Sequence, residues 1–115
     1  MTTKKLATLV IHAPEAKAKK GAKRFEDVLA DGVGVEYAIP RKDISKLLPG
    51  STVVLLRKDK NKRRAEGLLV KLLPTTRKTP QGIQRYDVHI KNLTAVPYKP
   101  EKLNHYGVAV FCSNC

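Results

Sequence analysis

Hydrophobic and polar residues follow two patterns along this chain, and both predict strands. From residue 85 to residue 92 they alternate, with Tyr86, Val88 and Ile90 on one face and charged side chains on the other. This alternation is typical of a strand with one buried face. Between residues 52 and 57, four aliphatic residues follow one another as VVLL. Such a run predicts a strand that is buried on both faces.

Shorter apolar segments predict further strands at residues 6–11, 35–39, 66–73 and 106–111. The strands at 52–57 and 66–73 are joined by a charged connection, so we expect them to form a hairpin with a basic tip. Residues 75–82 contain Pro80 and Gly82 and predict an exposed loop.

Two segments show helical spacing instead. Phe25, Val28 and Leu29 predict an amphipathic helix over residues 22–30. Ile44 and the two leucines at 47–48 predict a second helix of one or two turns, for which Asp43 is a plausible N-cap and the following Pro-Gly pair a stop.

These elements predict an α+β, mainly β fold. About six short strands with one or two short peripheral helices suit a small bent-sheet pseudobarrel, because the long alternating helices of a doubly wound parallel sheet are missing. The 115 residues fit a single domain over 1–115, with residues 112–115 expected to form a flexible tail.

Targeting and cofactor signals are weak. The longest apolar runs are far shorter than the ~20 residues of a membrane helix, and residues 6–11 are too few for the core of a signal peptide. We therefore expect a cytoplasmic protein that does not bind membranes. Cys112 and Cys115 have C-x-x-C spacing, but a zinc site needs two more ligands. His89 and His105 are the only candidates in range, so we expect no metal or other cofactor.

Charge adds a functional expectation. With 23 basic and 10 acidic residues the net charge is +13, which favours a polyanionic partner. Six cations fall within the predicted hairpin tip: Arg57, Lys58, Lys60, Lys62, Arg63 and Arg64. A mobile cationic loop can follow a phosphate backbone and release its counterions, which gives affinity for nucleic acid without sequence preference.

Four more cations come next in the chain and could extend this basic surface: Arg77, Lys78, Arg85 and Lys91. Tyr98 lies between Pro97 and Lys99 and is the most accessible aromatic residue for stacking on a base. We expect Tyr86 to pack in the core, because it shares the apolar face of its strand.

No motif predicts catalysis. The histidines are isolated, and the chain has no nucleophile elbow, H-E-x-x-H motif or phosphate-cradling glycine loop. We therefore expect a non-catalytic domain that binds RNA or DNA. Two alternatives stay open: a protein-interaction module that uses the same basic surface for an acidic partner, and a dimeric DNA-binding regulator. The oligomeric state stays open as well.

Residues 37–55 (YAIPRKDISKLLPGSTVVL) place a strand, a short helix and a Pro-Gly turn before the next strand. In this stretch, and in element order over most of the chain, the protein resembles PUA-like proteins, which include the EVE and ASCH groups. That resemblance implies a bent-sheet pseudobarrel that binds RNA or modified DNA bases. The segments IPR at 39–41 and LPGSTV at 48–53 are also similar to AbrB-like swapped-hairpin factors, which would imply a DNA-binding dimer.

Overall fold

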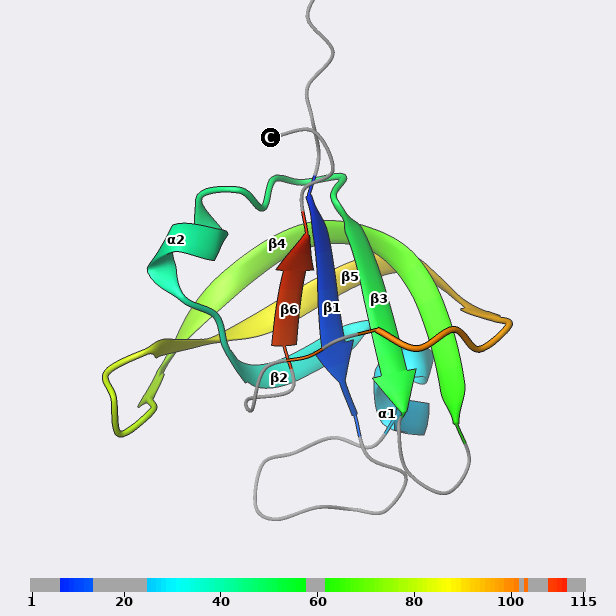
Figure 1. Cartoon of the computed structure of the whole chain (residues 1–115), viewed down its shortest axis with the longest axis horizontal. Coiled ribbons are helices and arrows are strands. Elements are labelled where there is room, and N and C mark those ends of the chain that lie inside the picture. The colour runs from blue at the N-terminus through cyan, green and yellow to red at the C-terminus, as the bar shows by residue number, and fades with distance from the viewer. Residues whose placement is uncertain (1–6, 14–24, 58–61, 102, 104–107, 112–115) are drawn as a thin grey trace, which may run out of the picture.

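In the computed structural model of the chain, residues 7–13, 25–57, 62–101, 103 and 108–111 are described. Figure 1 shows their arrangement. The elements in chain order are β1 (Thr8–His12), α1 (Phe25–Asp31), β2 (Val33–Ala38), α2 (Arg41–Ile44), β3 (Thr52–Arg57), β4 (Arg63–Lys78), β5 (Gln84–Val96) and β6 (Val108–Phe111).

All six strands belong to one sheet in the order β2-β5-β4-β3-β1-β6. The pairs are antiparallel except for β1 and β3, which run parallel. The sheet curls into a half-barrel, with β6, β1 and β3 in front of β2 and β5 in Figure 1. The mainly β fold with two short helices that the sequence predicts is therefore confirmed.

The two longest strands produce this curl. β4 and β5 pair from Arg64 opposite Val96 to Lys78 opposite Gln84, and their register shifts at three places. Bulges of this kind bend a strand and increase its twist. As a result β4 arches over the whole molecule, and its two ends lie on opposite sides of it (Figure 1).

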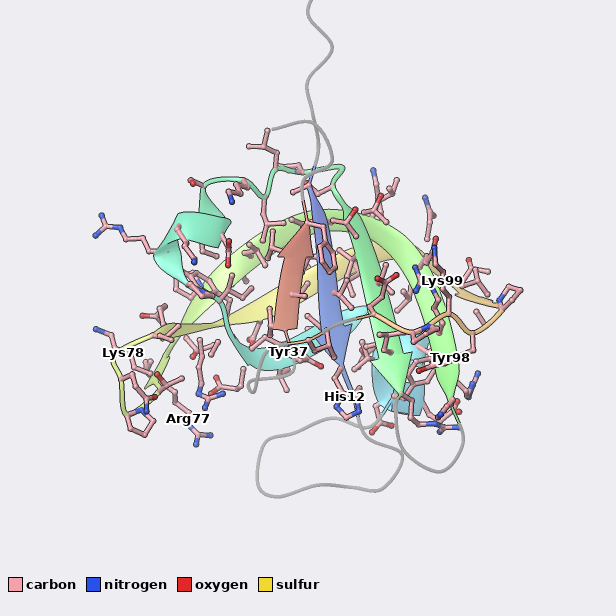
Figure 2. All side chains as sticks on the ribbon, viewed as in Figure 1. His12, Tyr37, Arg77, Lys78, Tyr98 and Lys99 are labelled. Atoms are coloured by element: carbon pink, nitrogen blue, oxygen red, sulfur yellow. The ribbon has the colours of Figure 1, made fainter. Side chains whose placement is uncertain are left out.

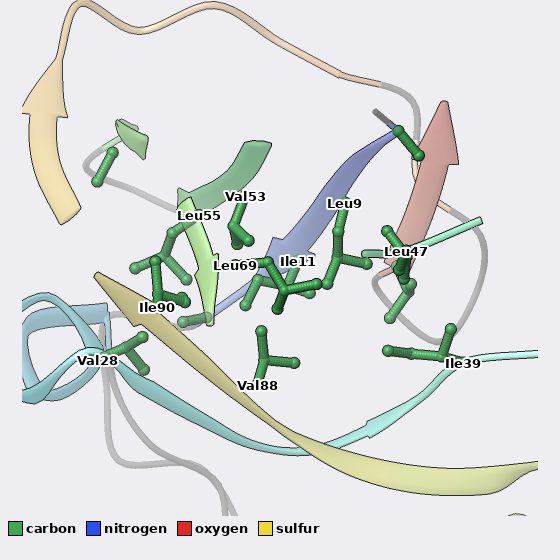
Figure 3. Packing of buried hydrophobic residues seen from close by; sticks show 14 of the residues in the cluster. Leu9, Ile11, Val28, Ile39, Leu47, Val53, Leu55, Leu69, Val88 and Ile90 are labelled. Carbon is green, nitrogen blue, oxygen red and sulfur yellow. The ribbon is translucent and has the colours of Figure 1, made fainter. Parts of the chain in front are cut away.

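The concave face of the sheet holds the main hydrophobic core. Leu9 and Ile11 from β1 and Val53 and Leu55 from β3 point into it, where they meet residues of β4 and β5 (Figure 3). Phe25 and Val28 of α1 are fully buried in the same cluster, so the helix covers one end of the half-barrel. The apolar face of β5 also points inward, as the alternation predicts.

A second, smaller cluster lies on the convex face of β1 and β3. There Val10, Val54 and Leu56 are buried beneath Tyr98 and Leu103, which belong to the connection between β5 and β6 that crosses in front of β3 (Figure 1). The VVLL run is thus buried on both faces, and that prediction is confirmed.

A side-chain hydrogen bond crosses the open side of the half-barrel. The Tyr37 hydroxyl of β2 donates a hydrogen bond of 2.9 Å to the carbonyl of His12 at the end of β1. β2 and β1 are not neighbours in the sheet, so this bond joins strands that no backbone ladder connects. Both residues lie below the sheet centre in Figure 2. Burial raises the pKa of the Tyr37 phenol above its ordinary value.

Two local predictions are wrong. The second helix lies earlier than predicted: α2 begins at Arg41, with Pro40 at the N-cap and no side-chain cap, and ends at Ile44. Asp43 therefore lies inside the helix, and the two leucines at 47–48 follow it. Proline suits this helix start because its restricted φ, here −59°, fits the entry to a helix and no amide is left unpaired. β4 also extends beyond residues 66–73 at both ends, so Arg63 and Lys78 lie in a strand rather than in loops.

Candidate functional site

Most of the described cations of the predicted basic tip are buried or half-buried and do not stand free in solvent. Lys58 and Lys60 lie outside the described part of the chain. Lys62 is exposed. Arg57 and Arg63 face each other across the β3–β4 ladder, and Arg57 is only 5% exposed. Arg57 therefore belongs to the protein interior and not to an exposed phosphate-binding surface.

Both of these arginines pack on α1. The guanidinium carbons of Arg57 and Arg63 lie 5.6 Å and 4.8 Å from the centroid of the Phe25 ring, within the range of a cation–π contact. The Glu26 carboxylate forms an ion pair with Arg63 and lies 4.0 Å from Arg57. The two cations therefore attach α1 to the β3–β4 hairpin.

Arg64 has a different internal role. It is 8% exposed, and its guanidinium donates hydrogen bonds of 2.8 Å to both Glu66 and Glu101 and one of 2.9 Å to the carbonyl of Lys99. Burial alone would lower the pKa of Arg64, but the two carboxylates raise it above its ordinary value. Arg64 therefore fastens the β5–β6 connection to β4.

The other predicted cations lie elsewhere on the molecule. Arg77 and Lys78 are exposed at the far end of β4, one strand length from the basic tip (Figure 2). Lys91 is exposed on the convex face, opposite Leu68. Arg77 and Lys78 therefore lie at the opposite end of β4 from Arg63 and Arg64.

The turn between β4 and β5 is well ordered by hydrogen bonds. The Thr79 amide donates to the Ile83 carbonyl at 2.9 Å, and the Thr79 hydroxyl accepts from the Ile83 amide at 3.0 Å. Gly82 adopts a φ of 86°, a left-handed conformation that favours glycine. The Gln84 side-chain amide donates to backbone carbonyls of both strands. The strand ends beside Lys78 are thus held in place.

Next to this turn is an open pocket of about 440 Å³. One wall is the segment that leads into α2, and the other is the β4–β5 turn. Each wall carries one cation, Arg41 on the first and Lys78 on the second, and Tyr86 adds an aromatic side chain to the lining. The full lining is Ile39, Pro40, Arg41, Pro74, Lys78, Gly82, Ile83, Gln84 and Tyr86.

Arg85 and Arg77 gather around a bulge in β2. Glu36, at the bulge, has a φ of 63°, and its carbonyl accepts a 2.9 Å hydrogen bond from Arg85. The Glu36 carboxylate lies 3.4 Å from Arg77, whose side chain is 62% exposed. Asp87 accepts a hydrogen bond from the Glu36 amide. The Arg85 guanidinium is therefore bonded to the backbone of β2, whereas the Arg77 side chain still faces solvent.

Tyr98 is half-buried against the convex-face cluster rather than standing free. It lies over β3 in Figure 2, next to Lys99. Its ring has a packing role in this cluster, and an additional role in base stacking remains a prediction.

Sequence reasoning did not identify the pocket or Arg41. Two segments that are far apart in sequence, residues 39–41 and the β4–β5 hairpin, form the lining, and a strand-to-helix corner holds Arg41. The only sequence signal was Arg41 itself, a charged residue directly after a proline, which by itself predicts no site.

No group of three or more histidine, cysteine or acidic side chains could hold a metal within the described residues. Cys112, Cys115 and His105 lie outside that part of the chain. In the same described part, no helix has the length and apolar character needed to cross a membrane.

No family model, curated protein or solved structure matches this chain. The resemblances to PUA-like and AbrB-like proteins therefore stay predictions.

Proposed function

We propose that this chain binds nucleic acid, RNA or DNA, without catalysing a reaction, and that the pocket beside the β4–β5 turn makes the contact. One observation carries the proposal: Arg41 and Lys78 are both exposed and both line a pocket that also contains Tyr86. Two such cations can neutralise neighbouring phosphates. The aromatic and proline surfaces between them suit a base or a sugar.

The surrounding structure supports this role. Hydrogen bonds of Thr79 and Gln84 fix the turn, so binding would order little additional backbone, and a preorganised site loses less entropy on binding. Arg77 is exposed one residue before Lys78 and can add a further phosphate contact. The net charge of +13 would speed the approach of any polyanion.

The buried arginines have a smaller part in this proposal. Arg57 lies next to Glu26, and Arg64 is held by Glu66 and Glu101. Release of Arg64 would leave Glu66 and Glu101 without this partner. Exposed Lys62 and Lys91 remain predicted contacts outside the pocket.

A cytoplasmic location is part of the same proposal, because two cysteines three positions apart cannot form the disulfide framework of a small secreted domain.

The first test compares affinities over a range of salt concentrations. Fluorescence anisotropy would be measured with labelled single-stranded RNA, single-stranded DNA and duplex DNA. For the double variant Arg41→Ala/Lys78→Ala we expect weaker binding to all sequences of the preferred probe. The slope of log affinity against log salt should fall by about two, because each of the two cations neutralises one phosphate.

Lys99→Ala is the matched control, because Lys99 is exposed but lies on the β5–β6 connection away from the pocket. Its salt slope should stay close to that of the unmodified chain. An unchanged slope in the double variant would move the contact away from this pocket. If none of the three probes binds in a salt-dependent way, the chain is not a nucleic-acid-binding protein.

A further inference from the structure

The second half of β4 is an edge of the sheet. β3 pairs with β4 only as far as Leu68, and the Leu69 backbone bonds to that of Gly50 and Ser51 at 2.8 Å and 2.7 Å. From Val70 to Lys78 the strand pairs with β5 alone among the described residues. A proline at position 74 lies in this stretch, as prolines in sheets do at edges. An edge of this kind offers unpaired backbone groups to another strand.

A short apolar groove accompanies this edge. Its far wall is formed by Ile44, Leu47 and Pro49, and its near wall by β4 from residue 69 to residue 72. The groove has a volume of about 290 Å³. Val70 in the groove is 40% exposed, and Leu73, just beyond it, is 42% exposed. An added strand would remove this apolar surface from water, which favours binding.

The charge of the groove favours an acidic occupant. Lys71 is exposed in its lining, and no aspartate or glutamate contributes to that lining among the described residues. Asp43 on α2 lies nearby in sequence, but it forms an ion pair with Lys46 at 3.9 Å. A second copy of this chain would bring another +13 and a second Lys71, and like charges across a strand pair are unfavourable.

We propose that β4 between Val70 and Leu73 accepts an extended acidic segment of a partner protein as an added strand. Backbone hydrogen bonds hold the segment to the edge, its apolar side chains enter the groove, and its carboxylates pair with Lys71. Strand addition of this kind combines affinity from the main chain with specificity from side-chain pockets. This site differs from the proposed nucleic-acid site, which depends on Arg41 and Lys78.

The test uses labelled peptides of about nine residues, long enough to span the free edge. One alternates valine with glutamate, and its matched control alternates valine with lysine. We expect the acidic peptide to bind and the basic one not to bind. Hydrogen exchange should show added protection of β4 amides within Val70–Lys78 in the bound state.

Two variants test the site, and one serves as the control. Val70→Asp and Lys71→Glu should each weaken binding of the acidic peptide roughly tenfold. Lys62→Glu makes the same charge change at the opposite end of β4 and should have little effect. All three replaced residues are exposed, and thermal melts check that each variant remains folded.

Equal weakening by Lys62→Glu and Lys71→Glu would show attraction by overall charge and overturn the proposal. A concentration-dependent dimer that Val70→Asp abolishes would identify a second copy as the occupant and also overturn it. The nucleic-acid proposal is judged separately, because Lys71→Glu keeps Arg41 and Lys78 in place.

Discussion

The arginines of this chain show that the same side chain can be a binding group or a structural one, depending on what its guanidinium contacts. Arg64 is buried with two carboxylates and a carbonyl, while Arg77 is mostly exposed next to a single carboxylate. A cluster of cations in the sequence therefore reports charge, and only the packing tells which of these charges a ligand can reach.

Replacement of Arg64 by alanine should therefore act on stability. The change removes three charge-assisted hydrogen bonds and leaves the Glu66 and Glu101 carboxylates without their partner, which should cost roughly 1.5–3 kcal/mol of unfolding free energy. Urea denaturation measures this loss. Lys78→Ala, an exposed control, should stay within about 0.5 kcal/mol of the unmodified chain.

A stability loss for Arg64→Ala as small as that for Lys78→Ala would contradict the role of Arg64 in holding the β5–β6 connection. The sequence alone could not reveal this role. Arg64 and Glu101 are 37 positions apart, and no spacing pattern links them.

At the scale of the element, hydrophobic patterning predicted the strands well and their ends poorly. The alternation around Tyr86, Val88 and Ile90 identified β5, and the VVLL run identified the two-sided burial of β3. The end of β4 was missed because residues 75–78 have no apolar pattern. The pairing of Lys78 with Gln84 and the hydrogen bonds of the Gln84 side chain hold this segment as a strand instead.

At Gly67 the strands β4 and β5 approach each other closely. A Cβ at this position would lie 2.8 Å from Ile90 Cγ2 and from the Lys91 carbonyl oxygen, and 3.0 Å from the Leu93 Cα. The register between the two strands shifts here, with Gly67 between Glu66 and Leu68. Only a residue without a side chain fits between these backbones.

Gly67→Ala should consequently destabilise the protein by roughly 1–3 kcal/mol, the usual cost of overpacking. Urea denaturation followed by circular dichroism would measure it. Ala95→Ser, an exposed change on β5, serves as the control. A neutral Gly67→Ala variant would mean that the β4–β5 crossing can open without loss of stability, contrary to its close packing.

At the scale of the whole molecule, the order of strands lay beyond sequence reasoning. Neither the parallel pairing of β1 with β3 nor the separation of the two basic segments follows from their positions in the chain. Residues 64 and 77 are close in sequence, but an extended strand carries them to opposite ends of the fold (Figure 1). Closeness in sequence therefore does not place these two arginines on one surface.

The bond between Tyr37 and His12 stabilises this overall arrangement and makes it sensitive to alkali. Because burial raises the pKa of Tyr37 above its ordinary 10.0, the unfolded chain loses the phenol proton first as pH rises. The stabilising contribution of Tyr37 is therefore complete below about pH 10 and decreases above it. We expect the unfolding free energy to fall at high pH.

Tyr37→Phe should remove this part of the pH dependence. At neutral pH it should cost about 0.5–1.5 kcal/mol, the usual contribution of one hydrogen bond. Urea denaturation between about pH 8 and about pH 11 would compare the two proteins, with Tyr98→Phe as control. The two proteins are compared by their unfolding free energy as a function of pH. If the two free energies changed with pH in parallel over this range, burial would not raise the pKa of Tyr37 in the folded protein.

The place of β6 has a consequence for how the protein is made. β1 has β3 on one side and β6 on the other, so a chain leaving the ribosome exposes one side of its first strand until Val108–Phe111 has emerged. Open strands recruit other chains, and nascent proteins are most prone to aggregate in such states. The first strand therefore keeps one unpaired side until the four residues of β6 have been made and have paired with it.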